Sequence, residues 1–320
     1  MIALLLLQAS LTIAVSGPFT SPEYLPLRVA EAEGYFTQEG LQVSLRTTRA
    51  EAGAAEALAR GQAEVAATSL EAALRYGAVG GRPLRLIFGL TTAPPVALVV
   101  PLAHRNTVRR IEDLRGRHIG ISSPGAPEQA FLLALLERHR LQPGDLSLLS
   151  FGERGLVAAL EAGEVHAALL ADPWASRLAQ EGKAVVLADF RRREETVRWL
   201  GGPTVHAGLF VSGDRVPKAS DLTALARALL RAIRRVETGD SEELLARLPV
   251  RAVGLKDDFV ARIAGAREIY LRDGWVSLET IKLSLAMIRA RAPLPKAVTL
   301  PRSPGELLLP EPLKTILDSK

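Results

Sequence analysis

The sequence predicts an α/β protein of two similar lobes, each built on an open, mainly parallel sheet with helices on both faces. Three observations support this. Short apolar strands alternate with helical segments over residues 11–212, the first strand–turn–helix unit recurs, and 320 residues suit two domains. Ligands of such sheets bind beyond the carboxyl ends of the strands, so two lobes place the site in the cleft between them.

The first unit is a strand, a turn and a helix. Residues 11–15 are apolar and partly β-branched, which predicts a buried strand. Ser21 is a suitable N-cap and Pro22 a suitable first helical residue, so a helix is expected over 23–33, ending at Gly34. Its N-terminus presents free N–H groups and a positive dipole end, which favours an anionic or polar ligand.

The same unit recurs about a hundred residues later, the size of a small α/β unit. The turn Val-Ser-Gly-Pro at 15–18 is matched by Ile-Ser-Ser-Pro at 121–124, which leads into a helix over about 128–139. The pattern Ala-Leu-x-x-Gly-x-x-x-x-Ala at 57–66 recurs at 159–168. The agreement in order and spacing predicts two lobes that face each other.

The remaining elements follow from apolar periodicity and from glycine and proline breaks. Further strands are expected at 41–47, 64–67, 84–90, 96–100, 118–121, 146–151, 166–171, 184–187 and 204–212. Further helices are expected at 50–60 and 70–77 (capped by Thr68 or Ser69), 221–237 (capped by Ser220), 256–272, and 278–292 (capped by Ser277), with a turn at 35–40.

Two crossings divide the chain. The double proline at 94–95 predicts one crossing, and the strand over 204–212 returns the chain to the first lobe. Lobe one is therefore expected to comprise 11–92 and 208–320, and lobe two 97–203, with a hinge at 91–96 and 203–207. The leucines after Pro293 need burial, so this segment is expected to wrap over lobe one.

Composition excludes several kinds of function. The net charge is +5, but the arginines are scattered, and the clusters at 191–193 and 234–235 are expected to be solvated. No basic stripe interleaved with aromatic residues indicates nucleic-acid binding. Without cysteine there is no disulfide, thiolate nucleophile, cysteine-type zinc site or lipid-anchored N-terminal Cys. Five histidines without metal-binding spacing predict no metal site, and no cofactor is expected.

The N-terminal residues 1–9 (MIALLLLQA) form an apolar run that is too short to span a bilayer. The run resembles the apolar region of a secretory signal, with Ala9 as a cleavage residue. It lacks a basic region before it, and Leu7 is large where a small residue is favoured. We expect residues 1–10 to be a truncated signal segment; the alternative is an extension of the first strand. No later stretch predicts a transmembrane helix.

Three segments carry a family resemblance. They are Pro-Leu-x-Val-Ala-x-x-x-Gly-Tyr-Phe-x-x-Glu-Gly-Leu-x-Val at 26–43, Ile-x-Asp-Leu-x-Gly-x-x-Ile-Gly at 111–120, and Leu-x-x-Gly-x-x-x-Ala-Ala followed by Asp-Pro at 160–173. Together they resemble substrate-binding proteins of ABC importers, in the nitrate/sulfonate/taurine and NMT1/THI5-like branch. The resemblance implies a type II periplasmic-binding fold, which closes on a small molecule and delivers it to a membrane permease with its ATPase. It also implies a periplasmic protein, and we expect a monomer that is not an enzyme.

The residues expected to touch this ligand lie on loops that face the cleft. They are Phe19, Thr20, Tyr24, Thr68, Ser69, Ser122, Ser123, Gly125, Asp172, Trp174 and His206. Backbone N–H groups and hydroxyls could hold a carboxylate, a sulfonate or a ring carbonyl, while Phe19 or Trp174 could cover an apolar face. The ligand is thus expected to be small and anionic or heterocyclic, of the sulfonate, nitrate, carboxylate or pyrimidine type.

Each assignment has a structural alternative. The Ser and Thr residues could only cap helices, the two aromatic residues could be lobe packing, and His206 could be a structural histidine. An acid such as Asp172 in the cleft disfavours an anion and favours an amine or heterocyclic N–H. Asp172 could instead cap the segment after Pro173.

Other functions on this fold stay open as alternatives. Fungal pyrimidine-forming enzymes of the family carry a cysteine-rich motif that is absent here, and a menaquinone-pathway enzyme needs a catalytic group in the pocket. Asp172 or His206 could serve, but no base, nucleophile and orienting residue come together at a readable spacing. A sensory domain is the third alternative, and no output domain is attached. No diagnostic set of residues selects one ligand.

Overall fold

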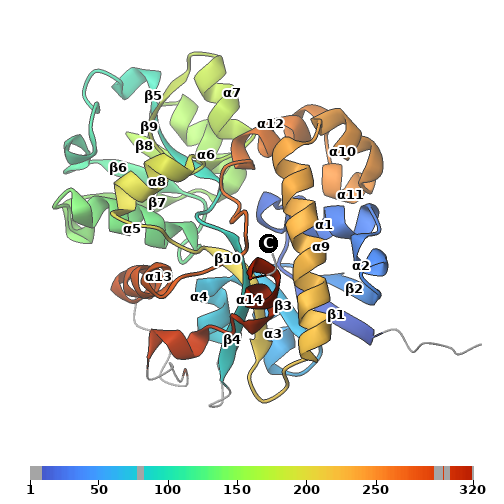
Figure 1. Cartoon of the computed structure of the whole chain (residues 1–320). Coiled ribbons are helices and arrows are strands. Elements are labelled where there is room, and N and C mark those ends of the chain that lie inside the picture. Colours follow the sequence, from blue (N-terminus) through green and yellow to red (C-terminus); the bar gives the residue numbers. More distant parts are fainter. Residues whose placement is uncertain (1–8, 78–82, 292–297, 299–302, 319–320) are drawn as a thin grey trace, which may run out of the picture.

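The protein consists of two lobes, each built round a five-stranded mixed sheet. The computed structural model describes residues 9–77, 83–291, 298 and 303–318. The first sheet has the order β2-β1-β3-β10-β4 and the second β7-β6-β8-β5-β9 (Figure 1). We call the parts built on the first and second sheets lobe one and lobe two.

The strands lie close to their expected positions. They are β1 (Ala9–Val15), β2 (Leu41–Thr47), β3 (Val65–Ser69), β4 (Leu84–Thr91) and β10 (Ala207–Ser212) in lobe one, and β5 (Val96–Pro101), β6 (His118–Ile121), β7 (Ser147–Ser150), β8 (Ala167–Ala171) and β9 (Ala184–Asp189) in lobe two.

Helices cover both faces of each sheet. The α-helices are α1 (Leu25–Ala32), α2 (Tyr35–Gln38), α3 (Glu51–Ala59), α4 (Leu70–Ala72), α5 (Glu128–Arg138), α6 (Gly152–Glu161), α7 (Trp174–Gln180), α8 (Arg193–Leu200), α9 (Ala219–Thr238), α10 (Ser241–Arg247), α11 (Val250–Val253), α12 (Lys256–Ala266), α13 (Leu278–Arg291) and α14 (Glu311–Leu317). Short 3₁₀ turns are η1 (Pro22–Tyr24), η3 (Leu102–His104), η4 (Ile111–Leu114), η5 (Pro143–Asp145) and η6 (Pro304–Leu307), and η2 (Ala73–Gly77) is a π-helical turn.

Strand direction follows from the two crossings. β1 pairs in parallel with β2 and β3, and β6 does so with β7 and β8. β5 and β10 are antiparallel to both of their neighbours. Each of these two strands enters its sheet directly from the other lobe, so it begins at the edge where its neighbours end. Four strands of each sheet therefore end at the cleft, which agrees with the expected fold class.

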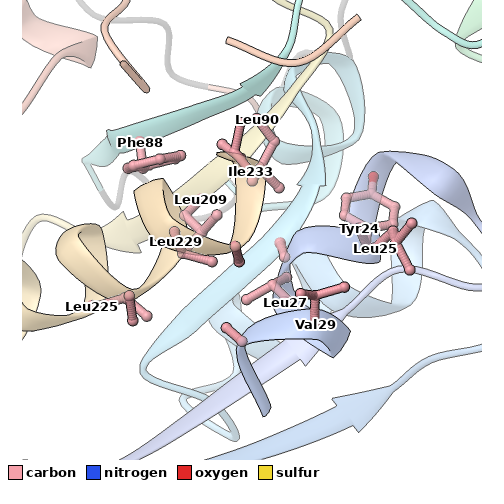
Figure 2. Packing of buried hydrophobic residues seen from close by; sticks show 14 of the residues in the cluster. Tyr24, Leu25, Leu27, Val29, Phe88, Leu90, Leu209, Leu225, Leu229 and Ile233 are labelled. Atoms are coloured by element: carbon pink, nitrogen blue, oxygen red, sulfur yellow. The ribbon is translucent and has the colours of Figure 1, made fainter. Parts of the chain in front are cut away.

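The two faces of the first sheet are buried by separate helical layers. Ile13 and Val15 belong to the core under α1 and α9, whereas Ala14 belongs to the opposite core under α3. Figure 2 shows apolar side chains of α1 and α9 meeting over the sheet, among them Leu27 and Leu229. Each fully buried leucine contributes about 1.5–3 kcal/mol to stability, so this layer holds the loop after β1 in place.

One helix packs into both lobes. From α13, Ile281 and Leu285 belong to a core of lobe one, and Met287 and Leu283 pack in the core of lobe two. Further along the chain, residues 303–318 return to lobe one, where the Leu309 N–H donates to the Leu86 carbonyl. Residues 292–297, 299–302 and 319–320 of the expected wrap lie outside the described residues.

Several local expectations are wrong. The helix expected over 256–272 ends at Ala266, because Ile269 accepts from the backbone N–H of Thr92 instead of continuing the helix. Ser21 does not cap a helix; its hydroxyl donates to Glu23. Residues 35–38 form the short helix α2 within the expected turn.

Of the other three serines expected to cap helices, two do so and one does not. Ser220 lies inside α9, which begins one residue earlier, and its hydroxyl donates to Asp221. Ser69 and Ser277 do cap their helices, accepting from the N–H groups of Ala72 and Thr280. The structure also has α10 between two expected helices, where the side chain of Asp240 caps its first turn.

The N-terminal segment is described only from Ala9, which with Ser10 belongs to β1 and pairs with β2. The rest of the expected signal segment, residues 1–8, lies outside the described residues. Among the helices that the structure describes, none combines the length and the apolar character that crossing a membrane requires.

Candidate functional site

A cavity of about 290 Å³ lies between the lobes at the carboxyl ends of the strands. Lobe one contributes Gly17, Pro18, Thr20, Ser21, Pro22, Glu23 and Glu51. The crossings contribute Pro94, Pro95, Val96 and His206, and helix α12 contributes Arg262. Lobe two contributes Ser122, Pro127, Glu128, Glu153, Leu156, Leu169, Leu170, Ala171, Asp172 and Trp174. Both lobes therefore build this site, which suits a molecule of modest size.

Glu51 is the centre of a hydrogen-bond network on lobe one. Its carboxylate accepts from the Tyr24 hydroxyl at 2.9 Å, the Thr68 hydroxyl at 3.0 Å and the Ser69 backbone N–H at 2.7 Å. Burial raises the pKa of Glu51, and the Ser69 N–H opposes this only in part. Burial, together with the charges of Glu51 and Glu23, holds the pKa of Tyr24 well above its ordinary value, so the phenol remains a donor.

Glu23 and His206 form a pair at the base of the cavity. His206 Nε2 lies 3.8 Å from Oε1 of Glu23, and the Ser21 hydroxyl donates to Oε2. Burial raises the pKa of Glu23, but the nearby His206 and the hydrogen bond from Ser21 outweigh it, and the pKa lies below its ordinary value. The His206 backbone joins the crossings, because its N–H donates to the carbonyl of Thr91.

Asp172 is held within lobe two by Arg191. The Arg191 Nη1 group donates to both oxygens of Asp172, at 2.8 and 2.9 Å, while its Nε donates to Asp189 at 2.8 Å. Asp172 also accepts from the Ser176 N–H at 2.9 Å, which is the capping role that was its alternative. The expectation that residues 191–193 are solvated is wrong for Arg191, which is only 7% exposed. Its charge is balanced there by the carboxylates of Asp172 and Asp189.

Helix α12 approaches lobe two closely at this point (Figure 1). A Cβ atom on Gly265 would collide with the carboxylate of Asp172. Arg177 of α7 donates to Asp258 of α12 at 2.7 Å, and its guanidinium lies 4.9 Å from the ring of Trp174. These contacts place α12 directly against lobe two beside the cavity.

The sequence-predicted residues divide into two groups. Those that line the cavity are Thr20, Ser122, Asp172, Trp174 and His206. Those that do not are Phe19, Tyr24, Thr68, Ser69, Ser123 and Gly125. Tyr24, Thr68 and Ser69 bind Glu51 instead, and Phe19 lies between the guanidinium groups of Arg28 and Arg251, at 3.9 and 4.2 Å. Ser123 and Gly125 are exposed, and the Gly125 N–H donates to Gln129.

Most of the charged residues that line the cavity were not among those predicted from the sequence. The missed residues are Glu23, Glu51, Glu128, Glu153 and Arg262, with the crossing prolines Pro94 and Pro95 beside them. The repeated unit contained a signal for two of them, because Pro22-Glu23 and Pro127-Glu128 stand at the start of the helical segments that follow β1 and β6. Among the described residues, no three His, Asp or Glu side chains are arranged to hold a metal ion.

Comparison with known proteins covers both lobes. Residues 21–236 match the family model described as NMT1/THI5 like. The taurine-binding periplasmic protein of Escherichia coli strain K12 is 26% identical over 188 residues, which are 56% of this chain and 53% of that protein. The chain thus spans about half the length of this curated relative.

Two solved structures extend the comparison. A protein from Bordetella bronchiseptica RB50 is 27% identical with a TM-score of 0.73, covering 97% of this chain and 98% of that one. The alkanesulfonate-binding protein SsuA from Xanthomonas axonopodis pv. citri, bound to MOPS, is 21% identical with a TM-score of 0.64. It covers 94% of this chain and 98% of its own, and it supports the fold alone.

Proposed function

The chain belongs to the NMT1/THI5-like family, and from this premise we propose that it is the solute-binding component of an ABC importer. One observation carries the proposal: a cavity of about 290 Å³ is lined by both lobes at the carboxyl ends of their strands. A ligand there contacts both lobes, so it stabilises their closed arrangement over the open one. Capture requires no covalent chemistry.

The hinge lies in the two crossings at 91–96 and 203–207. They run side by side, since the Thr204 hydroxyl donates to the Thr92 carbonyl at 2.7 Å and the His206 N–H to the Thr91 carbonyl at 2.8 Å. The protein acts as a periplasmic monomer, without catalysis, and delivers its ligand to a membrane permease with its ATPase. Its ligand is a small molecule of the sulfonate, carboxylate, nitrate or heterocyclic type, and the name of the taurine-binding relative supports the sulfonate class.

Thermal unfolding against a panel of these compounds tests the proposal. A ligand at a hundred times its dissociation constant adds about 2.7 kcal/mol of stability, which is a shift of several degrees for a chain of this size. We expect a shift with the compound recovered intact. Conversion of the compound would instead indicate an enzyme on the same fold.

A pair of neighbouring serines supplies a matched test of the site. Ser122 lines the cavity, whereas Ser123 is exposed and does not. We expect Ser122→Leu to abolish the ligand-induced shift, because the larger side chain fills the cavity, and Ser123→Leu to leave it intact. Equal ligand shifts in both variants would place binding elsewhere.

A further inference from the structure

Carboxyl groups outnumber basic groups in the cleft. The carboxyl groups that line the cavity are those of Glu23, Glu51, Glu128, Glu153 and Asp172. The basic groups among the lining residues are His206 and Arg262. A cleft that takes a free anion is expected to show the opposite balance, because like charges repel strongly away from bulk water.

Two of these carboxyl groups have a basic neighbour within 4 Å. Glu23 pairs with His206 at 3.8 Å, and Asp172 pairs with Arg191 at 2.8 Å. Arg262 and Glu153 both line the cavity, and Arg262 donates to the Val253 carbonyl at 2.6 Å. Of the two basic groups that line the cavity, His206 is therefore matched by an acid of the protein and Arg262 by a backbone carbonyl.

Glu51 and Glu128 are different. Among the described residues neither carboxylate has a Lys, Arg or His nitrogen within 4 Å, although the charge of His206 acts on Glu51. Neutral donors hold both: three groups of lobe one bind Glu51, and the Ser122 hydroxyl donates to Glu128 at 2.8 Å. Such hydrogen bonds fix a carboxyl group in position, and burial raises the pKa of Glu51 while the charge of His206 acts against this.

Two of the acids that line the cavity, Glu23 and Glu128, stand at the start of the helical segments where a ligand anion could bind. Glu23 and Glu128 each follow a proline, in the first turn of the helical segments after β1 and β6. A carboxylate at a helix N-terminus takes the favourable interaction with the dipole that an anionic ligand would otherwise have. An anionic ligand at these two loops would therefore meet a carboxylate of the protein at the same helical end.

The rest of the cavity is apolar on the side of lobe two, where Leu156, Leu169, Leu170 and Trp174 line it. Taking these observations together, and resting on the proposed function, we propose that the cleft selects a ligand with a positively charged group, a protonated amine or an amidine-like heterocycle, held between Glu51 and Glu128. Among the ligand classes considered above, an aminosulfonate or a protonated heterocycle fits this cleft, and nitrate or a simple sulfonate does not.

Calorimetric titration with matched probes tests this inference. Benzamidine, benzoate and benzenesulfonate share a flat apolar ring and differ in charge; taurine and ethanesulfonate differ by one ammonium group. We expect the cationic or zwitterionic member of each set to bind at least about tenfold more tightly than its anionic partner. Glu128→Gln, which keeps the side-chain shape, should reduce that preference by about tenfold or more.

Controls separate the possible outcomes. Glu112→Gln removes an exposed carboxylate of lobe two outside the cavity and should leave the preference unchanged. Thermal unfolding without ligand checks that each variant is folded. Tighter binding of the anions, or an unchanged preference in Glu128→Gln, would overturn the inference while capture in the cleft still stands. Binding by no probe at all would contradict the proposed function, and the inference with it.

Discussion

The two sides of the cleft arise from the same strand–turn–helix unit but differ in chemistry. On lobe one, Glu51 gathers a hydroxyl, a phenol and a backbone N–H around a buried carboxylate. On lobe two, leucines and Trp174 line the cavity beside Glu128 and Glu153, and Asp172 is already bound to Arg191. The repeated backbone thus places the cavity at the strand ends of both lobes, whereas the side chains give each wall of the cavity its own chemistry.

The largest effect should come from the ion pairs of lobe two. Arg191→Met leaves the side chains of Asp172 and Asp189, which are 3% and 11% exposed, without their cation. Removing one partner of such a buried group costs about 3–5 kcal/mol, measurable by urea unfolding. Arg192→Met is the matched control: this arginine is 53% exposed, and its loss should cost less than about 1 kcal/mol. Equal losses would show that lobe two does not depend on the buried pair.

A smaller effect is expected on lobe one. Glu51→Ala leaves the donors of Tyr24, Thr68 and Ser69 without their acceptor, which should cost about 2–3 kcal/mol. Glu128→Ala removes the acceptor of Ser122 alone among the described hydrogen bonds and should cost about 1 kcal/mol or less. Urea unfolding of both variants tests the comparison directly. A Glu128→Ala variant as unstable as Glu51→Ala would contradict it.

The pH dependence should have opposite signs for the two acids of lobe one. The pKa of Glu51 is raised above its ordinary value of 4.5, so the folded state retains a proton that the unfolded chain has lost. Its contribution to stability therefore falls as pH rises from 4.5 through the raised pKa. Glu51→Gln should remove this fall.

Glu23 behaves in the reverse way. Its pKa is lowered, so its contribution is present above the unfolded value of 4.5 and is lost as pH falls through the lower pKa. Glu23→Gln should therefore flatten the acidic limb of the stability profile. Urea unfolding across a pH series measures both limbs, and the same limb changing in both variants would refute the assignment.

The smallest effect should come from the contact that joins the lobes beside the cavity. The Arg177–Asp258 pair has side chains that are 40% and 22% exposed. Arg177→Met should change the midpoint of thermal unfolding by an amount equivalent to less than about 1 kcal/mol, and salt should reduce the difference further. A larger, salt-independent loss would mean that this pair is more than a surface contact.

The fold was predictable because its signals are local. The strand over 41–47 alternates in its own sequence, and the repeated turns at 15–18 and 121–124 identify the two units without any distant contact. The helix expected over 256–272 shows the limit. Ile269 contacts Thr92 through a hydrogen bond between residues far apart in the chain, and this ends the helical pattern early.

The site was predictable in position but not in side-chain direction. Ser122 and Trp174 line the cavity because they follow strands that end there. Thr68 follows such a strand too, yet its hydroxyl turns to Glu51, which is 17 residues earlier in the chain. Whether a polar side chain meets the ligand or another residue depends on that partner's place in the fold, which spacing along the sequence does not contain.

Helix α13 has a consequence for how the molecule unfolds. Its apolar residues belong to the cores of both lobes, so neither lobe can lose its packing without exposing apolar surface of the other. The two halves are therefore thermodynamically coupled and are expected to melt in one cooperative transition, although each is built on a sheet of its own. A ligand bound in the cleft then raises the stability of the whole chain rather than that of one lobe.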